Sequence, residues 1–318
     1  MAKKSPGLSM ESPNKPDTCF ILGVSQRCGT NFVYRLLNQH RRCIAPGPIW
    51  EDFLISRVQR LAEYVDGVYD DWDEKEWGFE STLGGKYRLD HLLGEAIEKF
   101  LRLQLDPEYG ESPFLRNNKR PEDIRYLLTK TPSPEGIVHF HRFFPNAKLI
   151  LLVRDGRSVV ESMVSSFGAS YKEMMKVWRD NAIMIDQFRS HAPRDTNQYL
   201  IVKYEDLVLR KHESVKAILS FLNLDPREYD FAAAESIGIT GSSSLMRDHE
   251  TLHWRPQVQT AEFDPVFRYR DWSPSMHARF NLIAGEQMKI FGYELEPKRT
   301  WHLLHAIRHR IVEFFSSP

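Results

Sequence analysis

The sequence predicts an α/β fold of the P-loop-like, three-layer type, with a central parallel sheet flanked by helices. Short apolar runs alternate with amphipathic segments along most of the 318 residues, which is typical of parallel strands joined by helical crossovers. Residues 148–153 (KLILLV) are apolar without alternation, as expected of a strand buried on both faces. Residues 19–40 place a strand, a short loop and a helix in succession.

Residues 19–40 form the unit around which the predicted fold is arranged. The apolar residues 19–22 predict a strand, the loop 23–29 interrupts it, and Thr30 is expected to cap the helix that follows. The first turn of a helix carries unpaired N–H groups and partial positive charge, so it favours an anion. Arg27 adds a full charge to this loop. The unit therefore predicts a phosphate or sulfate site.

The remaining elements follow from the same periodicities. Residues 1–17 are polar and predict a disordered tail, residues 18–296 are expected to form the main domain, and 297–318 contain a C-terminal amphipathic helix. Residues 237–272 are poor in regular pattern, and 66–86 form an acidic, aromatic loop. Further strands are predicted at 43–45, 126–128 and 199–202, and helices at 49–65, 87–105, 135–144, 158–167, 171–191, 213–222 and 274–291.

Composition narrows the class of protein. Lys+Arg and Asp+Glu both number 43, and this zero net charge argues against a general nucleic-acid binder. The three cysteines are odd in number and lack metal-site spacing, so we expect reduced thiols and a cytoplasmic protein. Neither a secretory signal nor a transmembrane run of about 18 apolar residues is visible.

Polar residues follow the predicted strands at four points. The loop after residue 22, Lys130, Arg154 and Tyr204 each stand where a strand ends. Ligands of parallel sheets bind beyond the carboxyl ends of the strands, so these groups are expected in one crevice.

The first loop differs from the nucleoside-triphosphate P-loop, G-x-x-x-x-G-K-[ST]. Five residues separate Gly23 from Gly29, and Thr30 stands where the lysine is required. A metal-dependent P-loop kinase is therefore the alternative enzyme class rather than the favoured one.

Four motifs together resemble the sulfotransferases that use 3'-phosphoadenosine 5'-phosphosulfate (PAPS), most closely the tyrosylprotein-sulfotransferase branch and its bacterial relatives. Residues 26–31 (QRCGTN) are similar to the P-R-S-G-T-T loop of that branch, and 153–163 to its V-R-D-G-R-x-x-V-x-S-M motif. Residues 130–132 match K-x-P and 204–207 match Y-E-x-L. The resemblance covers about 19–293 and makes 18–296 a sulfotransferase domain.

The resemblance implies a PAPS-dependent sulfotransferase that releases adenosine 3',5'-bisphosphate and requires no metal. Arg154 and Ser162 would hold the 3'-phosphate, with Arg268 or Arg270 closing over it. Lys130 and Arg27 would stabilise the transferred group or its leaving oxygen. The remaining residues implied to bind the nucleotide are Cys28, Gly29, Thr30 and Asn31 in the loop, beside Arg27, and Tyr204.

Glu51 is the expected general base, because the related branch places a glutamate shortly after the first helix. Asp52 and the histidines His139 and His141 are alternatives, and Glu51 could instead interact with the dipole of the predicted helix 49–65 as a first-turn carboxylate.

The expected acceptor is a hydroxyl or amine of a carbohydrate or small polar metabolite, on the basis of loop 66–86. A peptide tyrosine or a lipid-linked glycan also fits, as does an inactive nucleotide-binding relative. The basic helix 300–315 could dock on the core, on a second subunit in a homodimer, or on a membrane surface.

Overall fold

The computed structural model describes residues 15–47, 51–71, 78, 84–106, 108, 112–192, 197–248, 251–257 and 264–296. Within 239–257 only the backbone is described. The predicted C-terminal helix and most of the predicted tail and of loop 66–86 lie outside these residues. Among the helices that are described, none is long and apolar enough to cross a membrane.

A five-stranded sheet with all neighbours parallel forms the centre of the molecule, in the order β2-β3-β1-β4-β5. β1 is the middle strand, and its residues after Asp17 are buried because both of its edges are paired and helices cover both faces. This arrangement confirms the predicted α/β fold with a parallel sheet. The strands are β1 (Asp17–Gly23), β2 (Cys43–Ile44), β3 (Tyr126–Thr131), β4 (Lys148–Val153) and β5 (Tyr199–Lys203).

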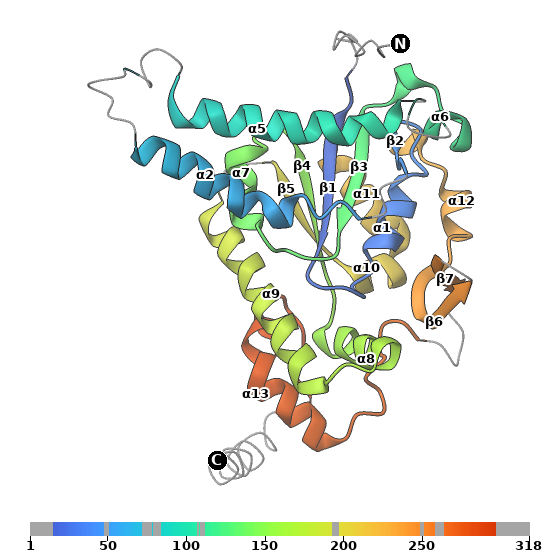
Figure 1. Ribbon diagram of the computed structural model, residues 1–318. Helices are drawn as coiled ribbons and strands as arrows, with labels where there is room; N and C mark the ends of the chain where they lie inside the picture. Colours follow the sequence, from blue (N-terminus) through green and yellow to red (C-terminus); the bar gives the residue numbers. More distant parts are fainter. Residues whose placement is uncertain are drawn as a thin grey trace.

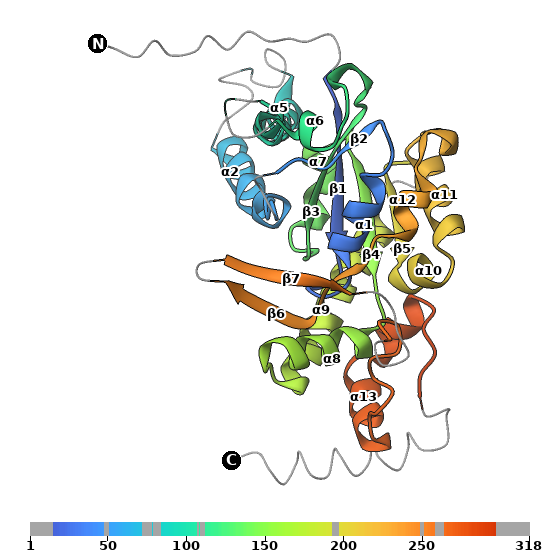
Figure 2. The ribbon, with the colours of Figure 1, turned by 90° about the vertical axis from the view of Figure 1, so that its right-hand side faces the viewer.

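Helices cover the two faces of the sheet and extend beyond its carboxyl ends. In the edge-on view α2, α5 and α7 lie on one side of the sheet, and α1, α10, α11 and α12 on the other (Figure 2). α8 and α13 lie past the carboxyl ends of the strands, where α9 packs against both (Figure 1). The helices are α1 (Thr30–Leu37), α2 (Val58–Asp70), α5 (Gly85–Arg102), α6 (Pro113–Arg116), α7 (Phe140–Phe143), α8 (Gly156–Phe167), α9 (Tyr171–His191), α10 (Tyr204–Leu209), α11 (Lys211–Phe221), α12 (Phe231–Glu235) and α13 (Pro274–Ile290).

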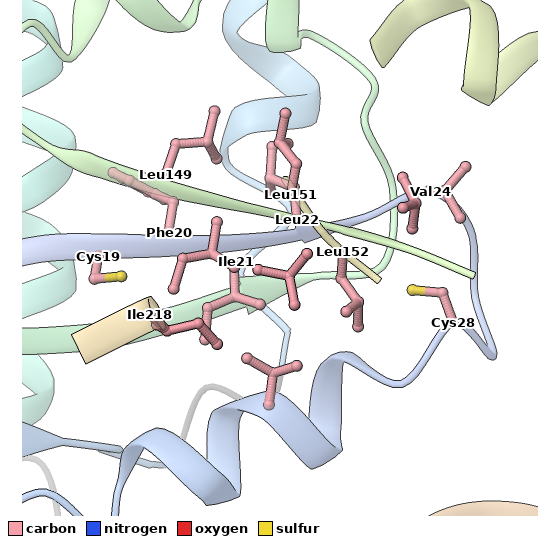
Figure 3. Close-up of a cluster of buried hydrophobic side chains, with 14 of the residues drawn as sticks. Cys19, Phe20, Ile21, Leu22, Val24, Cys28, Leu149, Leu151, Leu152 and Ile218 are labelled. Atoms are coloured by element: carbon pink, nitrogen blue, oxygen red, sulfur yellow. The ribbon is translucent and has the colours of Figure 1, made fainter. Parts of the chain in front are cut away.

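The core is built around β1 and the strands beside it. Figure 3 shows the apolar side chains of β1 and β4 packed together, with the sulfur of Cys28 directed from the loop back into this cluster. Cys19, Cys28 and Cys43 are all buried, and none of them is in a disulfide. Burial raises the pKa of the Cys28 thiol, which therefore acts as a small apolar side chain.

Three local predictions are wrong, because the local pattern alone does not determine these elements. Helix α2 begins at Val58 after a short 3-10 turn (Ile55–Arg57), so Glu51 and Asp52 precede the helix instead of forming its first turn. Gly29, not Thr30, is the N-cap of α1. The region predicted to be irregular contains an antiparallel hairpin, β6 (Ile239–Asp248) and β7 (Thr251–Gln257), which lies beside α1 and α8.

Candidate active site

The loop between β1 and α1 has a backbone conformation and packing that require glycine at two positions. Gly29 has φ 103°, and a Cβ atom there would lie 2.4 Å from Cδ2 of Tyr204. A Cβ atom on Gly23 would lie 2.2 Å from Sγ of Cys28. Both glycines are therefore required by close approach of side chains, and Gly29 also by its positive φ. Because the Cys28 thiol is in the core, Cys28 could contact a ligand only through its backbone.

Arginines from three segments meet over this loop. Arg27, at φ 69°, donates from Nε to Oγ of Ser162 at 3.0 Å. Arg154, at the end of β4, donates to the carbonyl oxygens of Arg27 and Pro265. Burial together with the neighbouring Arg154 and Arg268 lowers the pKa of Arg27. The same factors, burial and the nearby Arg154, lower the pKa of Arg268. Such a concentration of positive charge favours an anion.

Arg154 also has a hydrogen-bond donor that could bind a ligand. Its guanidinium carbon lies 4.4 Å from the centroid of the Tyr204 ring. Its buried Nε has no hydrogen-bond partner among the described residues, and neither has the buried hydroxyl of Tyr204. A buried N–H that lacks a partner is unfavourable, so a bound oxyanion here would relieve that cost.

Tyr204 lies beneath the loop rather than on its surface. The side chain is fully buried, with its ring against Gly29 on one side and Arg154 on the other. Burial raises the pKa of Tyr204 to about 12, so the phenol is neutral at pH 7. In this position Tyr204 supports the loop, and its predicted contact with the nucleotide stays a prediction.

Two arginines of the segment 264–296 were candidates for the same anion, and the structure separates them. Arg268 is close enough to Arg154, Arg27 and Tyr204 to interact with them electrostatically. Arg270 instead pairs with Asp264 at 2.8 Å and is largely exposed. Arg268 therefore belongs to the arginine cluster, defined here as Arg27, Arg154 and Arg268, and Arg270 lies outside it.

A carboxylate and a lysine form an ion pair beside this cluster. Nζ of Lys130, in β3, donates to Oε1 of Glu51 at 3.2 Å. The Lys130 side chain is 3% exposed and that of Glu51 is 24% exposed. Burial lowers the pKa of Lys130, while Glu51 opposes that shift. The pair thus offers a partly accessible carboxylate next to a buried cation.

The alternative bases have other partners. The Asp52 carboxylate accepts hydrogen bonds from the hydroxyls of Thr129 and Thr131, and from the N–H of Leu54 at 2.8 Å. The ring of His139 contacts Gln59, and that of His141 contacts Gln198 and stacks on Phe188 at 4.8 Å. Among the residues that the structure describes, Glu51 contacts Lys130 through Oε1 alone, so its second carboxylate oxygen is the one left for an acceptor.

The sheet brings these groups to one edge, as expected from their places after the strands. β1 is paired to both β3 and β4, with Ile21 opposite Lys130 and Gly23 opposite Leu152. Arg154 donates to the carbonyl oxygen of Arg27, which connects the loop to the end of β4. Thr30 and Asn31 are the first two residues of α1 at the same edge. Among the described residues, no three His, Cys, Asp or Glu side chains are grouped to hold a metal ion.

Asp155 and Glu205 fix the backbone under the arginine cluster. Asp155 is the N-cap of α8 and accepts from the N–H of Arg157 at 2.9 Å. Glu205 accepts from the N–H of Asp155 and from the hydroxyl of Tyr293, each at 2.9 Å. These contacts hold the end of β4, and with it Arg154, in one position.

The contact of two threonines with Asp52 was not predicted from the sequence. Thr129 and Thr131 flank Lys130 in β3, and their hydroxyls bind Asp52. Their only signal was polarity at two positions of a buried strand end, which does not identify the partner.

Comparison with known proteins gives the family of the chain. The family model described as "Sulfotransferase family" matches residues 18–228, which is more than half of the chain. The chain belongs to the sulfotransferase family. This confirms the family resemblance drawn from the four motifs.

Curated members of the sulfotransferase family show the same relationship. Protein-tyrosine sulfotransferase 1 of Danio rerio is 30% identical over 253 residues, covering 76% of this chain and 64% of that protein. The protein-tyrosine sulfotransferase of Drosophila melanogaster is 36% identical over 225 residues, covering 67% of this chain and 39% of that protein. The chain thus spans less than two thirds of the length of either relative. Among solved structures, a sulfotransferase domain from the curacin biosynthetic pathway is similar over 89% of this chain and 99% of that domain, with 20% identity and a TM-score of 0.49.

Proposed function

We propose that this chain transfers a sulfuryl group from PAPS to the phenolic hydroxyl of a tyrosine in a protein or peptide. One observation carries the proposal: the Glu51–Lys130 pair stands at the same sheet edge as the arginine cluster and the β1–α1 loop. The cluster supplies the charge that a bisphosphorylated nucleotide needs, and the pair supplies a proton acceptor and a cation for the transfer.

The donor would be held by the residues that the sequence identified. Arg154, Ser162 and Arg268 would bind the 3'-phosphate, a role supported by the unpartnered Nε of Arg154. The loop, through Arg27 and the backbone of residues 28–31, would bind the 5'-phosphosulfate, as a helix N-terminus favours an anion. Tyr204 would support both arginine and loop from beneath.

In the transfer itself, Glu51 would accept the proton of the attacking hydroxyl. The acceptor oxygen forms a bond to sulfur while the bond from sulfur to the phosphate oxygen breaks. Lys130, with its buried ammonium group, would stabilise the negative charge that develops on that leaving oxygen. The products are the sulfated acceptor and adenosine 3',5'-bisphosphate.

The acceptor class is proposed from the relatives, both of which are named protein-tyrosine sulfotransferases. This differs from the carbohydrate or small polar acceptor favoured by the sequence analysis. That expectation relied on residues 66–86, which lie mostly outside the described residues. A kinase is not supported, because the loop lacks the P-loop lysine.

The test is transfer from radiolabelled PAPS to a tyrosine-containing peptide. A matched peptide with phenylalanine in place of tyrosine is the control, and a panel of sugars and small phenols is assayed in parallel. Label in the tyrosine peptide alone is the expected result. Label in sugars or phenols alone would overturn the acceptor class. Phosphate transfer from ATP with Mg²⁺ would overturn the reaction class, and binding of adenosine 3',5'-bisphosphate without any transfer would identify an inactive relative.

A further inference from the structure

Asp52 is a buried carboxylate next to the proposed catalytic pair, and the mechanism above does not use it. Its Oδ1 accepts from the hydroxyl of Thr131 at 3.0 Å and from the N–H of Leu54 at 2.8 Å. Its Oδ2 accepts from the hydroxyl of Thr129. These three donors satisfy the carboxylate from within the fold.

The two threonines that bind Asp52 are the residues directly before and after Lys130. Thr129 and Thr131 flank Lys130 in β3, and alternate side chains of a strand point to opposite faces of the sheet. The backbone N–H of Asp52 donates to the carbonyl oxygen of Lys130 at 3.2 Å. Asp52 therefore binds one face of β3 through its side chain, while the preceding residue, Glu51, reaches Lys130 on the other.

The segment after Asp52 has a backbone that needs such support. Phe53 is not a glycine, yet it has φ 48°, a conformation that an L side chain rarely adopts. Its N–H donates to the hydroxyl of Thr131 at 3.1 Å, and its carbonyl oxygen accepts from the hydroxyl of Ser56 at 2.6 Å. Strained backbone of this kind persists only where surrounding contacts hold it. The same threonine thus holds both Asp52 and Phe53.

We propose that Asp52 is a positioning residue, which holds segment 51–54 on β3 so that the Glu51 carboxylate stays against Lys130. The inference rests on the proposed function for its kinetic consequence, but the placement of Glu51 on Lys130 can be measured without any transfer. Asp52 acts through Glu51 and has no contact of its own with the acceptor.

The kinetic test compares Asp52→Asn in the wild-type chain and in the Glu51→Gln chain, with the tyrosine peptide as acceptor. Alone, Asp52→Asn should lower kcat by about 10- to 100-fold, as expected of a small displacement of a catalytic group, with the Kd of adenosine 3',5'-bisphosphate unchanged. In the Glu51→Gln chain the same substitution should lower kcat no further. Losses that multiply in the double variant would overturn the proposal, because they would show that Asp52 acts independently of Glu51.

A second measurement does not depend on activity. Acetylation of Lys130 by acetic anhydride, followed by mass spectrometry in the absence of any nucleotide, should be faster in Asp52→Asn than in the wild type, since the lysine loses its neighbour. An unchanged rate would contradict the proposal. If the wild type transfers sulfate to no acceptor, the proposed function fails, while labelling of Thr131→Val, which keeps the Asp52 carboxylate, still shows whether the contacts of Asp52 hold Glu51 on Lys130.

Matched variants separate positioning from general stability. Thr131→Ser keeps the hydroxyl and should retain wild-type kcat and labelling, whereas Thr131→Val removes it and should reproduce Asp52→Asn. Asp90, another buried carboxylate, pairs with Arg142 at 2.7 Å in a different part of the fold. Asp90→Asn should lower the melting temperature and leave the labelling of Lys130 at its wild-type rate. Equal labelling in Thr131→Ser and Thr131→Val would contradict the proposal.

Discussion

The site has two halves that differ in their balance of charge: the first half is the arginine cluster, and the second half is Lys130 with Glu51 and Asp52. In the arginine cluster, Arg154 contacts carbonyl oxygens and a tyrosine ring, and Arg27 donates to a serine hydroxyl. In the other half, Lys130 is paired directly with Glu51, and Asp52 is satisfied by two threonines. Positive charge therefore accumulates in the first half and is balanced within the second.

This difference predicts a division of labour. A cluster of like charges gains stability when an anion binds, so the first half should determine nucleotide affinity. A neutral ion pair gains little from an anion but can accept and stabilise charge during a reaction, so the second half should determine turnover. Substitutions in the two halves should consequently affect different constants.

The largest effect is expected for Glu51→Gln. Removal of a general base should lower kcat by about 10²- to 10⁴-fold, because the acceptor hydroxyl then loses its proton acceptor. The Kd for adenosine 3',5'-bisphosphate, measured by calorimetry, should not change. Exposed Glu122→Gln is the control and should match the wild type. A Glu51→Gln chain with normal kcat would remove Glu51 from the role of base.

Arg154→Met should change the Kd of the nucleotide rather than kcat. Loss of charged hydrogen bonds to a phosphate should weaken adenosine 3',5'-bisphosphate binding by about 10- to 150-fold. Adenosine 5'-phosphate, which lacks the 3'-phosphate, should bind both chains with similar affinity. Ser162→Ala removes a neutral donor and should show the same selectivity with a smaller loss. Equal losses for the two nucleotides would place Arg154 away from the 3'-phosphate.

Gly29→Ala should destabilise the β1–α1 loop, which belongs to the first half of the site. The methyl group meets both a positive φ and the Tyr204 ring, so the free energy of unfolding should fall by roughly 2–4 kcal/mol. Gly168 has φ 65° and open space around its Cβ position. Gly168→Ala therefore meets only the unfavourable φ and should lower the free energy of unfolding by about 1–2 kcal/mol. Denaturant unfolding measures both. Equal costs would show that contact with Tyr204 does not constrain Gly29.

The smallest expected effect is a pH dependence of stability in the second half. Burial raises the pKa of Asp52 above its usual value, so between the unfolded and folded pKa the native chain holds a proton that the unfolded chain has lost. Stability from this group therefore falls as pH rises through that window. Asp52→Asn lacks the titration, so its unfolding free energy relative to the wild type should increase from pH 4 to pH 7. A constant difference would contradict the raised pKa.

Local pattern predicted the scaffold well. The strand at 148–153 and the helix at 171–191 have the predicted bounds, because a continuous apolar run and a capped amphipathic pattern are local signals. The hairpin β6–β7 was missed because serines 242–244 weaken the strand pattern. Helix α10 was missed because it begins directly after β5.

The site was predictable to the extent that it follows strand ends. The family motifs named Arg27, Lys130, Arg154 and Ser162, and the parallel sheet brings their segments to one edge. Arg268 and Arg270 stand in one short motif, so only tertiary contacts distinguish them: Arg270 pairs with Asp264, whereas Arg268 lies near Arg154. The conformation of 51–54 depends on threonines almost eighty residues away, which no local pattern contains.

Side chains that follow β4 bind the segment 264–296 through three of its backbone oxygens. Arg154 donates to the carbonyl oxygen of Pro265, Ser158 to that of Val266 at 2.5 Å, and Arg157 to that of Glu294 at 3.0 Å. Every residue type carries such an oxygen, so the side chains at these positions can change in evolution without loss of the contact. The family match ends at residue 228, yet Arg268 lies in the arginine cluster. The three contacts to these oxygens therefore do not depend on which side chains stand at positions 265, 266 and 294.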